Sequence, residues 1–183
     1  METFTKPREL VESPHYREQR RTCLAELEEA TLDAPVIELV RAFNRLPHCF
    51  TLQSCYGHFL YNGQHDARNL EPLPIAGTIT RVEYRIAYMA LCVENSASGK
   101  KLLKGLREVT ALDPENIQFG SADWFWERQV NSYALQVEPV RFMYQDRAIL
   151  GYREALRIEQ VRDAFLIRLQ ALLQQQVTGE TIG

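Results

Sequence analysis

Apolar residues recur at helical spacing near the start of the chain. Ser13-Pro14 is typical of a capping residue followed by proline at the first helical position. After it, Tyr16, Cys23, Leu27 and Ala30 fall on one helical stripe among arginines and glutamates. The pattern predicts an amphipathic helix of about four turns, with Cys23 as a small core residue.

A second helix is predicted to begin at Asp33, which stands as a cap before a proline two residues further on. Ile37, Val40 and Phe43 form its buried stripe. Pro47 ends the helix, because proline cannot continue the backbone hydrogen bonding of a helix. The helix therefore leads directly into the residues that follow Pro47.

Two more helices are predicted in the second half of the chain. Residues 95–98 supply caps for a helix over residues 100–110, and Asp146 is the predicted cap of a long last helix that reaches roughly Gln176. The apolar positions of this last helix are Ile158, Val161, Phe165, Leu169 and Leu172. Their spacing follows the 3.6-residue period, which indicates packing on the domain rather than a coiled coil.

Apolar runs between these helices predict strands. Residues 43–61 show a strand, a polar turn with Gly57 at positive φ, and a returning strand, which is the pattern of a tight hairpin. Residues 78–94 are strand-like, and their later part, 86–93, is apolar on both faces, as expected of a central strand. Shorter strands are predicted over residues 116–120 and 132–140.

Two tryptophans follow the first of these short strands. In an extended segment, Trp124 and Trp126 would share one face and Phe125 the other. Such aromatics either fill the edge of the core or form a stacking wall for a purine ring. Together the patterns predict an α/β fold, with a single domain over residues 1–183, a mixed sheet flanked by amphipathic helices, and a long C-terminal helix.

Composition is that of an ordinary globular protein. The 183 residues are 45% hydrophobic and 25% charged. The net charge of -3 gives no basic footprint, which disfavours a dedicated nucleic-acid binder unless its positive charge lies on one face. The first residues lack the apolar core of a signal peptide, and no stretch is apolar enough to span a membrane. We therefore expect a cytoplasmic protein with free thiols and no membrane partner, and the sequence does not indicate an oligomeric state.

The candidate chemistry lies between residues 48 and 58, which hold two of the four cysteines and two of the four histidines. A zinc site built from His48, Cys49, Cys55 and His58 matches no standard spacing, so no metal site is predicted. The other possibilities are a Cys55 nucleophile beside His58 or His65, a nest of backbone N–H groups for an anion, and a plain tight turn with Cys55 buried. The plain turn is favoured by the sequence pattern alone.

The loop over residues 62–77 carries three glycine or proline breaks, and a loop of this length in a compact domain is usually functional or mobile. His65 and Asp66 lie in it. A solvated loop is the favoured interpretation, and a contribution of these two residues to a site is the alternative.

A series of motifs is spread over residues 14–140. An aspartate follows the first helix, an asparagine ends the second, and a strand leads into a Ser-Cys-x-Gly motif. These are Asp33, Asn44, Thr51, Ser54, Cys55 and Gly57. This order resembles the wybutosine-synthesising tRNA methyltransferase family, whose strand enters a Ser-Ser-Cys-Ser-Gly-Arg motif. Later counterparts of that family's elements are Leu91-Cys92-Val93, the 100–110 helix and Gly120-Ser121.

The resemblance implies an S-adenosylmethionine-dependent enzyme that acts on tRNA. The donor's amino-acid end would bind the backbone of Ser54, Cys55, Tyr56, Gly57 and His58, with Trp124 against the adenine, and the substrate-binding candidates would be Asn44, His65, Arg81 and Arg85. The chain departs from the family in having His58 in place of the motif's arginine and Cys92 in place of a strand histidine. The alternative is therefore a non-catalytic binding or interaction protein that keeps the fold and an anion or nucleotide pocket.

Overall fold

The computed structural model describes residues 4–75, 77–142 and 147–180. Its α-helices are α1 (Tyr16–Ala25), α2 (Ile37–Arg45), α3 (Ala97–Val109), α4 (Asp123–Arg128) and α5 (Tyr152–Glu180). Its strands are β1 (Phe4–Thr5), β2 (Cys49–Cys55), β3 (His58–Tyr61), β4 (Arg81–Arg85), β5 (Ala87–Val93), β6 (Ile117–Ala122), β7 (Ser132–Val137) and β8 (Arg147–Gly151). Short 3-10 turns are η1 (Glu29–Thr31), η2 (Ala34–Val36), η3 (Thr110–Leu112) and η4 (Val140–Phe142).

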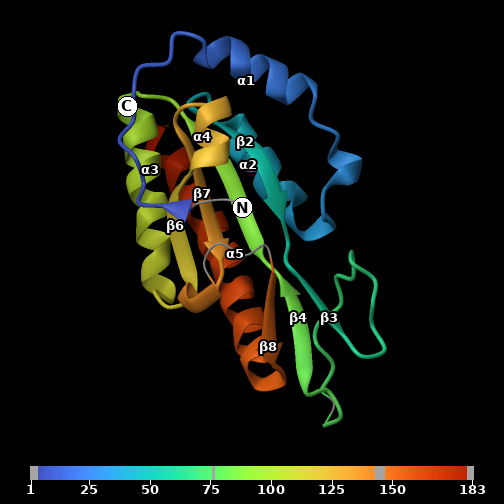
Figure 1. Ribbon diagram of the computed structural model, residues 1–183. Helices are drawn as coiled ribbons and strands as arrows, with labels where there is room; N and C mark the ends of the chain where they lie inside the picture. The colour runs from blue at the N-terminus through green and yellow to red at the C-terminus, as the bar shows by residue number, and fades with distance from the viewer. Residues whose placement is uncertain (1–3, 76, 143–146, 181–183) are drawn as a thin grey trace.

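The strands form two antiparallel sheets (Figure 1). One has five strands in the order β1-β6-β7-β5-β2, and the other has three in the order β3-β4-β8. The long helix α5 lies behind the strands in this view, whereas α4 lies in front of them. The α/β fold class and the long C-terminal helix are thus confirmed, as is the central strand, because β5 lies between β2 and β7.

The predicted hairpin at Gly57 is wrong, because β2 and β3 do not pair with each other. β2 pairs with β5 and β3 pairs with β4, so the chain passes from one sheet to the other at Gly57. Gly57 has φ +90, and a Cβ added there would lie 2.8 Å from Cβ of Ala87. The glycine is required because the kink between β2 and β3 passes close to Ala87 of β5. Local alternation of apolar and polar residues cannot distinguish such a kink from a reversal of the chain.

The two faces of the five-stranded sheet differ. Helices α2, α3 and α5 pack on one face, where Met89 and Leu91 of β5 and Leu135 of β7 join the main apolar core. On the opposite face, Tyr88 pairs with Gln136 and Ala90 pairs with Ala134. Phe50 and Leu52 of β2 also lie on that face, which α1 and α4 cover only in part. It is the face on which a ligand can approach the sheet.

Tyr84 joins the two sheets at the kink. Its hydroxyl donates to the Val137 carbonyl of the larger sheet at 2.9 Å and accepts from the Ala87 N–H at 2.9 Å. Its ring stacks on Phe59 of the smaller sheet, with centroids 4.9 Å apart. Because Tyr84 is fully buried, these bonds hold the junction between the sheets in one geometry.

Several predicted boundaries need correction. α1 ends at Ala25, so Leu27 and Ala30 lie beyond it, and the Ser13 side chain forms no cap. The segment that holds Trp124 is helical, so the two tryptophans do not share a strand face. Residues 147–151 form β8, a strand missed because it is short and lies directly before α5. The predicted cap Asp146 lies outside the described residues.

A search of the described helices for a bilayer-spanning segment found none with the required length and apolarity.

Candidate functional site

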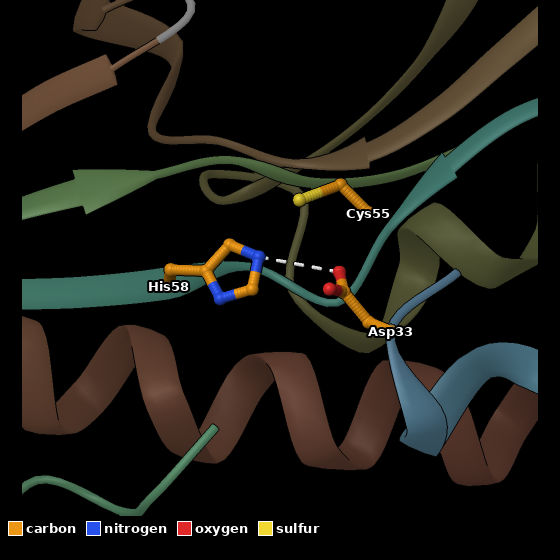
Figure 2. A group of neighbouring side chains, drawn as sticks. All are labelled: Asp33, Cys55 and His58. Atoms are coloured by element: carbon orange, nitrogen blue, oxygen red, sulfur yellow. Dashed lines mark ion pairs between the residues drawn. The ribbon is translucent and has the colours of Figure 1, made fainter. Parts of the chain in front are cut away.

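Three side chains from separate parts of the chain meet beside the kink. Asp33 precedes η2, Cys55 ends β2 and His58 begins β3, and Figure 2 shows their side chains pointing toward one another. Their potential ligand atoms all lie within 4.8 Å of one another. We call these three residues the Asp33–Cys55–His58 cluster. It brings a carboxylate, a thiol and an imidazole together beside the kink.

Both ring nitrogens of His58 face hydrogen-bond acceptors. Nε2 lies 3.2 Å from Oδ2 of Asp33, and Nδ1 lies 3.1 Å from the Asn69 carbonyl oxygen. A ring that donates from both nitrogens is an imidazolium. The hydrogen bond to Asp33, together with one to Cys55, raises the pKa of His58 to about 10, although burial opposes the shift. His58 is thus a cation paired with a carboxylate at neutral pH.

Asp33 is not the helix cap that the sequence predicts, because its side chain makes no capping bond to η2. Its Oδ2 instead accepts the Tyr56 N–H at 2.8 Å. Burial alone would raise the pKa of Asp33, but the hydrogen bonds from His58 and the Tyr56 N–H outweigh it and lower that pKa. The nest predicted over residues 54–58 therefore has one of its N–H groups occupied by the chain's own carboxylate.

Arg162 of α5 holds the other side of the kink, and sequence analysis missed it. Its Nη1 donates to the Gly57 carbonyl at 3.2 Å, and its guanidinium lies 4.0 Å from the centroid of the Tyr56 ring. The side chain is only 3% exposed and is paired with Asp163 and Glu159. The sequence does mark this residue, because Arg162 falls on the apolar stripe of α5. A charged residue at such a position needs a buried partner.

A cavity of about 260 Å³ opens on the face of the five-stranded sheet that α1 and α4 partly cover, next to the Asp33–Cys55–His58 cluster. It is lined by Gln53, Cys55, Arg85, Ile86, Tyr88, Phe125, Ala134 and Gln136. A wider groove of about 590 Å³, between β2 and the segment from Cys23 to Leu32, shares Gln53 and Tyr88 with it. The Tyr88 hydroxyl donates to Oε1 of Gln53 at 3.3 Å where the two spaces meet.

The residues predicted to bind a cofactor are only partly brought together. Ser54 lines the groove, and its buried Oγ has no hydrogen-bond partner among the described residues. Cys55 lines the cavity. Trp124 lines neither space; Arg128 lies over its ring at 4.0 Å, and the neighbouring Phe125 contributes to the cavity wall instead.

The predicted substrate-binding residues lie further apart. Arg85 lines the cavity, whereas Arg81 is exposed at the start of β4 and His65 is exposed in the 62–77 loop. Asn44 fixes the end of α2 to β2, because its amide oxygen accepts the Thr51 N–H at 2.8 Å. Of these four residues, Arg85 alone lines either space.

The four-ligand zinc site considered from the sequence is wrong. His48 and Cys49 are buried at the opposite end of β2 from Cys55. Seven residues of extended chain separate the two ends by about 20 Å. The sequence also suggested a Cys55 nucleophile activated by His58 or His65. Of these two histidines, His58 lies beside Cys55.

No family model matches this chain, and no curated protein matches it. Two structures of the PH1069 protein from Pyrococcus horikoshii are similar in fold. One is 14% identical with a TM-score of 0.48, over 88% of this chain and 96% of that one. The other is 12% identical with a TM-score of 0.49, over 89% and 94%.

A hypothetical protein from Aeropyrum pernix is 15% identical with a TM-score of 0.40, over 79% of this chain and 96% of that one. These similarities transfer no function to the chain.

Proposed function

We propose that this protein binds S-adenosylmethionine in the cavity and groove on the open face of the larger sheet, and that it acts as a tRNA-modifying methyltransferase of the wybutosine type. The observation that carries the proposal is the composition of the cavity wall. Tyr88 and Phe125 offer aromatic surface, and Gln53 and Gln136 offer amides that can both donate and accept. An adenosyl group needs such a combination of stacking and polar contacts.

The remaining parts of the donor also have candidate partners. Arg85 supplies a guanidinium suited to the donor's carboxylate, and Ser54 lines the groove beside Gln53. The groove lies within the range of about 300–1,000 Å³ that is typical of small-molecule sites, and the cavity extends it. Methyl transfer asks the protein mainly to align donor and acceptor and to exclude water.

A second candidate is a binding protein that holds a nucleotide-like ligand without catalysis. The described lining of the cavity includes neither a carboxylate nor an imidazole. His58 has both ring nitrogens occupied, so it is not a free base. Glu26 and Glu28 line the groove, but a reaction that requires a general base at the cavity wall would lack one there. Binding alone requires no base.

Calorimetric titration with S-adenosylmethionine tests the first proposal. Saturable binding is expected, and Ala134→Leu should weaken it about tenfold or more, because the larger side chain fills the cavity. Ala111→Leu, at an exposed position in η3, is the matched control and should bind normally. No binding at millimolar donor would sink the proposal, and unchanged binding by Ala134→Leu would place the donor elsewhere.

Methyl transfer separates the two candidates. An enzyme of the wybutosine type methylates a guanosine in tRNA that other enzymes have already partly modified. Such tRNA, incubated with radiolabelled donor and protein, should therefore gain label if the protein is a methyltransferase of this type. Donor binding without transfer, over a range of tRNA preparations that includes precursors of the modified guanosine, favours the binding protein.

A further inference from the structure

The Asp33–Cys55–His58 cluster has the composition of a metal site, and we propose that it binds a Zn²⁺ ion. The ligands would be the Asp33 carboxylate, the Cys55 thiolate and Nε2 of His58. The Cys55 thiol and the His58 imidazolium would each release one proton to solvent as the ion binds. Zinc bonds of about 2.0 to 2.3 Å place two ligands of a tetrahedral ion roughly 3.3 to 3.8 Å apart. The cluster atoms already lie within 4.8 Å of one another, so a small inward movement brings them to that spacing.

Neighbouring groups orient two of the three ligands. Nδ1–H of His58 donates to the Asn69 carbonyl, which turns Nε2 toward Asp33 and Cys55. The Tyr56 N–H holds the Asp33 carboxylate in place from the other side. Metal-binding imidazoles commonly donate their second N–H to a carbonyl in this way, and such contacts fix the ring before the ion arrives.

The chemistry of the cluster selects the kind of ion. Mg²⁺ and Ca²⁺ prefer shells made of oxygen, and the cluster offers one carboxylate. A thiolate and an imidazole suit Zn²⁺ and similar transition metals. One thiolate and one carboxylate balance the charge of a divalent ion, so binding leaves no net charge in this largely buried place.

The site would keep an open position. The described residues supply three ligand side chains, and a zinc ion with three protein ligands retains a place for water or another ligand. Cys55 also lines the cavity on the open face of the sheet. The ion would therefore lie beside the cavity wall. Zinc binding by these three residues requires neither S-adenosylmethionine nor tRNA, so it is independent of the proposed function.

Spectroscopic titration with Co²⁺ followed by Zn²⁺ tests the proposal on the full chain after treatment with a chelator. One Co²⁺ per chain should produce a sulfur-to-cobalt charge-transfer band, and Zn²⁺ should displace it. Cys55→Ser should abolish the band and weaken Zn²⁺ binding by more than about 100-fold, since even residues that only support a ligand contribute 10- to 100-fold. Cys23→Ser changes the other partly accessible thiol and should leave both unchanged.

Asp33→Asn is a second variant, for the case in which Cys55→Ser fails to fold. Its amide oxygen can still accept the Tyr56 N–H, but it lacks the carboxylate charge, so Zn²⁺ should bind at least about tenfold more weakly. The proposal is overturned if the wild-type protein gives no charge-transfer band. It is equally overturned if the band is lost in Cys23→Ser and kept in Cys55→Ser. Ala134→Leu should bind Zn²⁺ normally, which separates this test from the donor titration.

Discussion

Strand β2 carries a cysteine and a histidine near each of its ends. Before it and at its start stand His48 and Cys49, which are both buried. At its end and beyond stand Cys55 and His58, which meet Asp33 beside a cavity. Burial raises the pKa of Cys49 well above its usual range, so its thiol is inert at neutral pH. Cys55 is only half-buried.

The difference lies in what the rest of the chain brings to each end. Arg20 of α1 donates to the Cys49 carbonyl at 3.2 Å and to the last carbonyls of α2, so the His48–Cys49 end is held as core. The other end receives a carboxylate from Asp33 and a guanidinium from Arg162. The same residue types thus serve packing at one end and a candidate site at the other.

The largest expected effect is that of Gly57→Ala, which attacks the kink at the site end. The new Cβ would meet Ala87 at 2.8 Å, and φ is +90. We expect a loss of about 3 kcal/mol or more in the free energy of unfolding, from strain and overpacking together. Gly63→Ala is the control, with φ +93 and nothing within 4 Å, and should cost about 1 kcal/mol. Urea unfolding measures both, and equal losses would contradict the tight kink.

Arg162→Met tests the support that α5 gives to the same end. The substitution keeps much of the apolar stem but leaves the buried Gly57 carbonyl without its donor. We expect a loss of about 2 to 3 kcal/mol in urea unfolding, the cost of an unsatisfied buried group. Arg153→Met, at an exposed position on the same helix, should change stability by less than about 0.5 kcal/mol. A similar small effect of Arg162→Met would show that the kink stands without α5.

A pair of cysteine variants compares the two ends directly. Cys49→Ser places a hydroxyl in the core and should cost about 2 kcal/mol. Cys55→Ser lies at a half-buried position and should cost less than about 1 kcal/mol in metal-free protein. Thermal and urea unfolding in the presence of a chelator check both values. The reverse order would mean that Cys55 is the packing residue of the two.

The smallest expected effect is a pH dependence that only the site end shows. Because the pKa of His58 is raised from about 6.5 to about 10, its contribution to stability is full below about pH 6.5. It is lost as the pH rises through about 10. In metal-free protein, the stability difference between wild type and His58→Gln should shrink by about 1 to 2 kcal/mol between pH 6.5 and 10, because solvent screens the ion pair.

Urea unfolding across this range measures the difference, and groups that titrate in both proteins cancel. Asp33 acts with the opposite sign. Its lowered pKa gives stability that is present above about pH 4 and is lost as the pH falls through the folded-state value. A pH-independent difference between wild type and His58→Gln would contradict the ion pair.

Much of the fold follows from local pattern. The apolar run at residues 86–93 predicts the central strand, and β5 covers Ala87–Val93. The caps at residues 95–98 predict the start of α3, where the Ser96 side chain accepts the Gly99 N–H. The positive φ predicted for Gly57 is confirmed, although the glycine forms a kink rather than a hairpin turn. These features depend on neighbours within one or two turns, which is the range over which periodicity and capping act.

The candidate site depended on contacts between residues far apart in the chain. The sequence places Cys55 near His58, but it gives Asp33 the role of a helix cap and does not single out Arg162. The structure brings Asp33 to Tyr56 and His58, and it brings Arg162 to Gly57 across 105 positions. Periodicity reports which face of an element is buried but not which partner covers it. Only the tertiary structure therefore decided that the kinked strands leave backbone groups for these two side chains to satisfy.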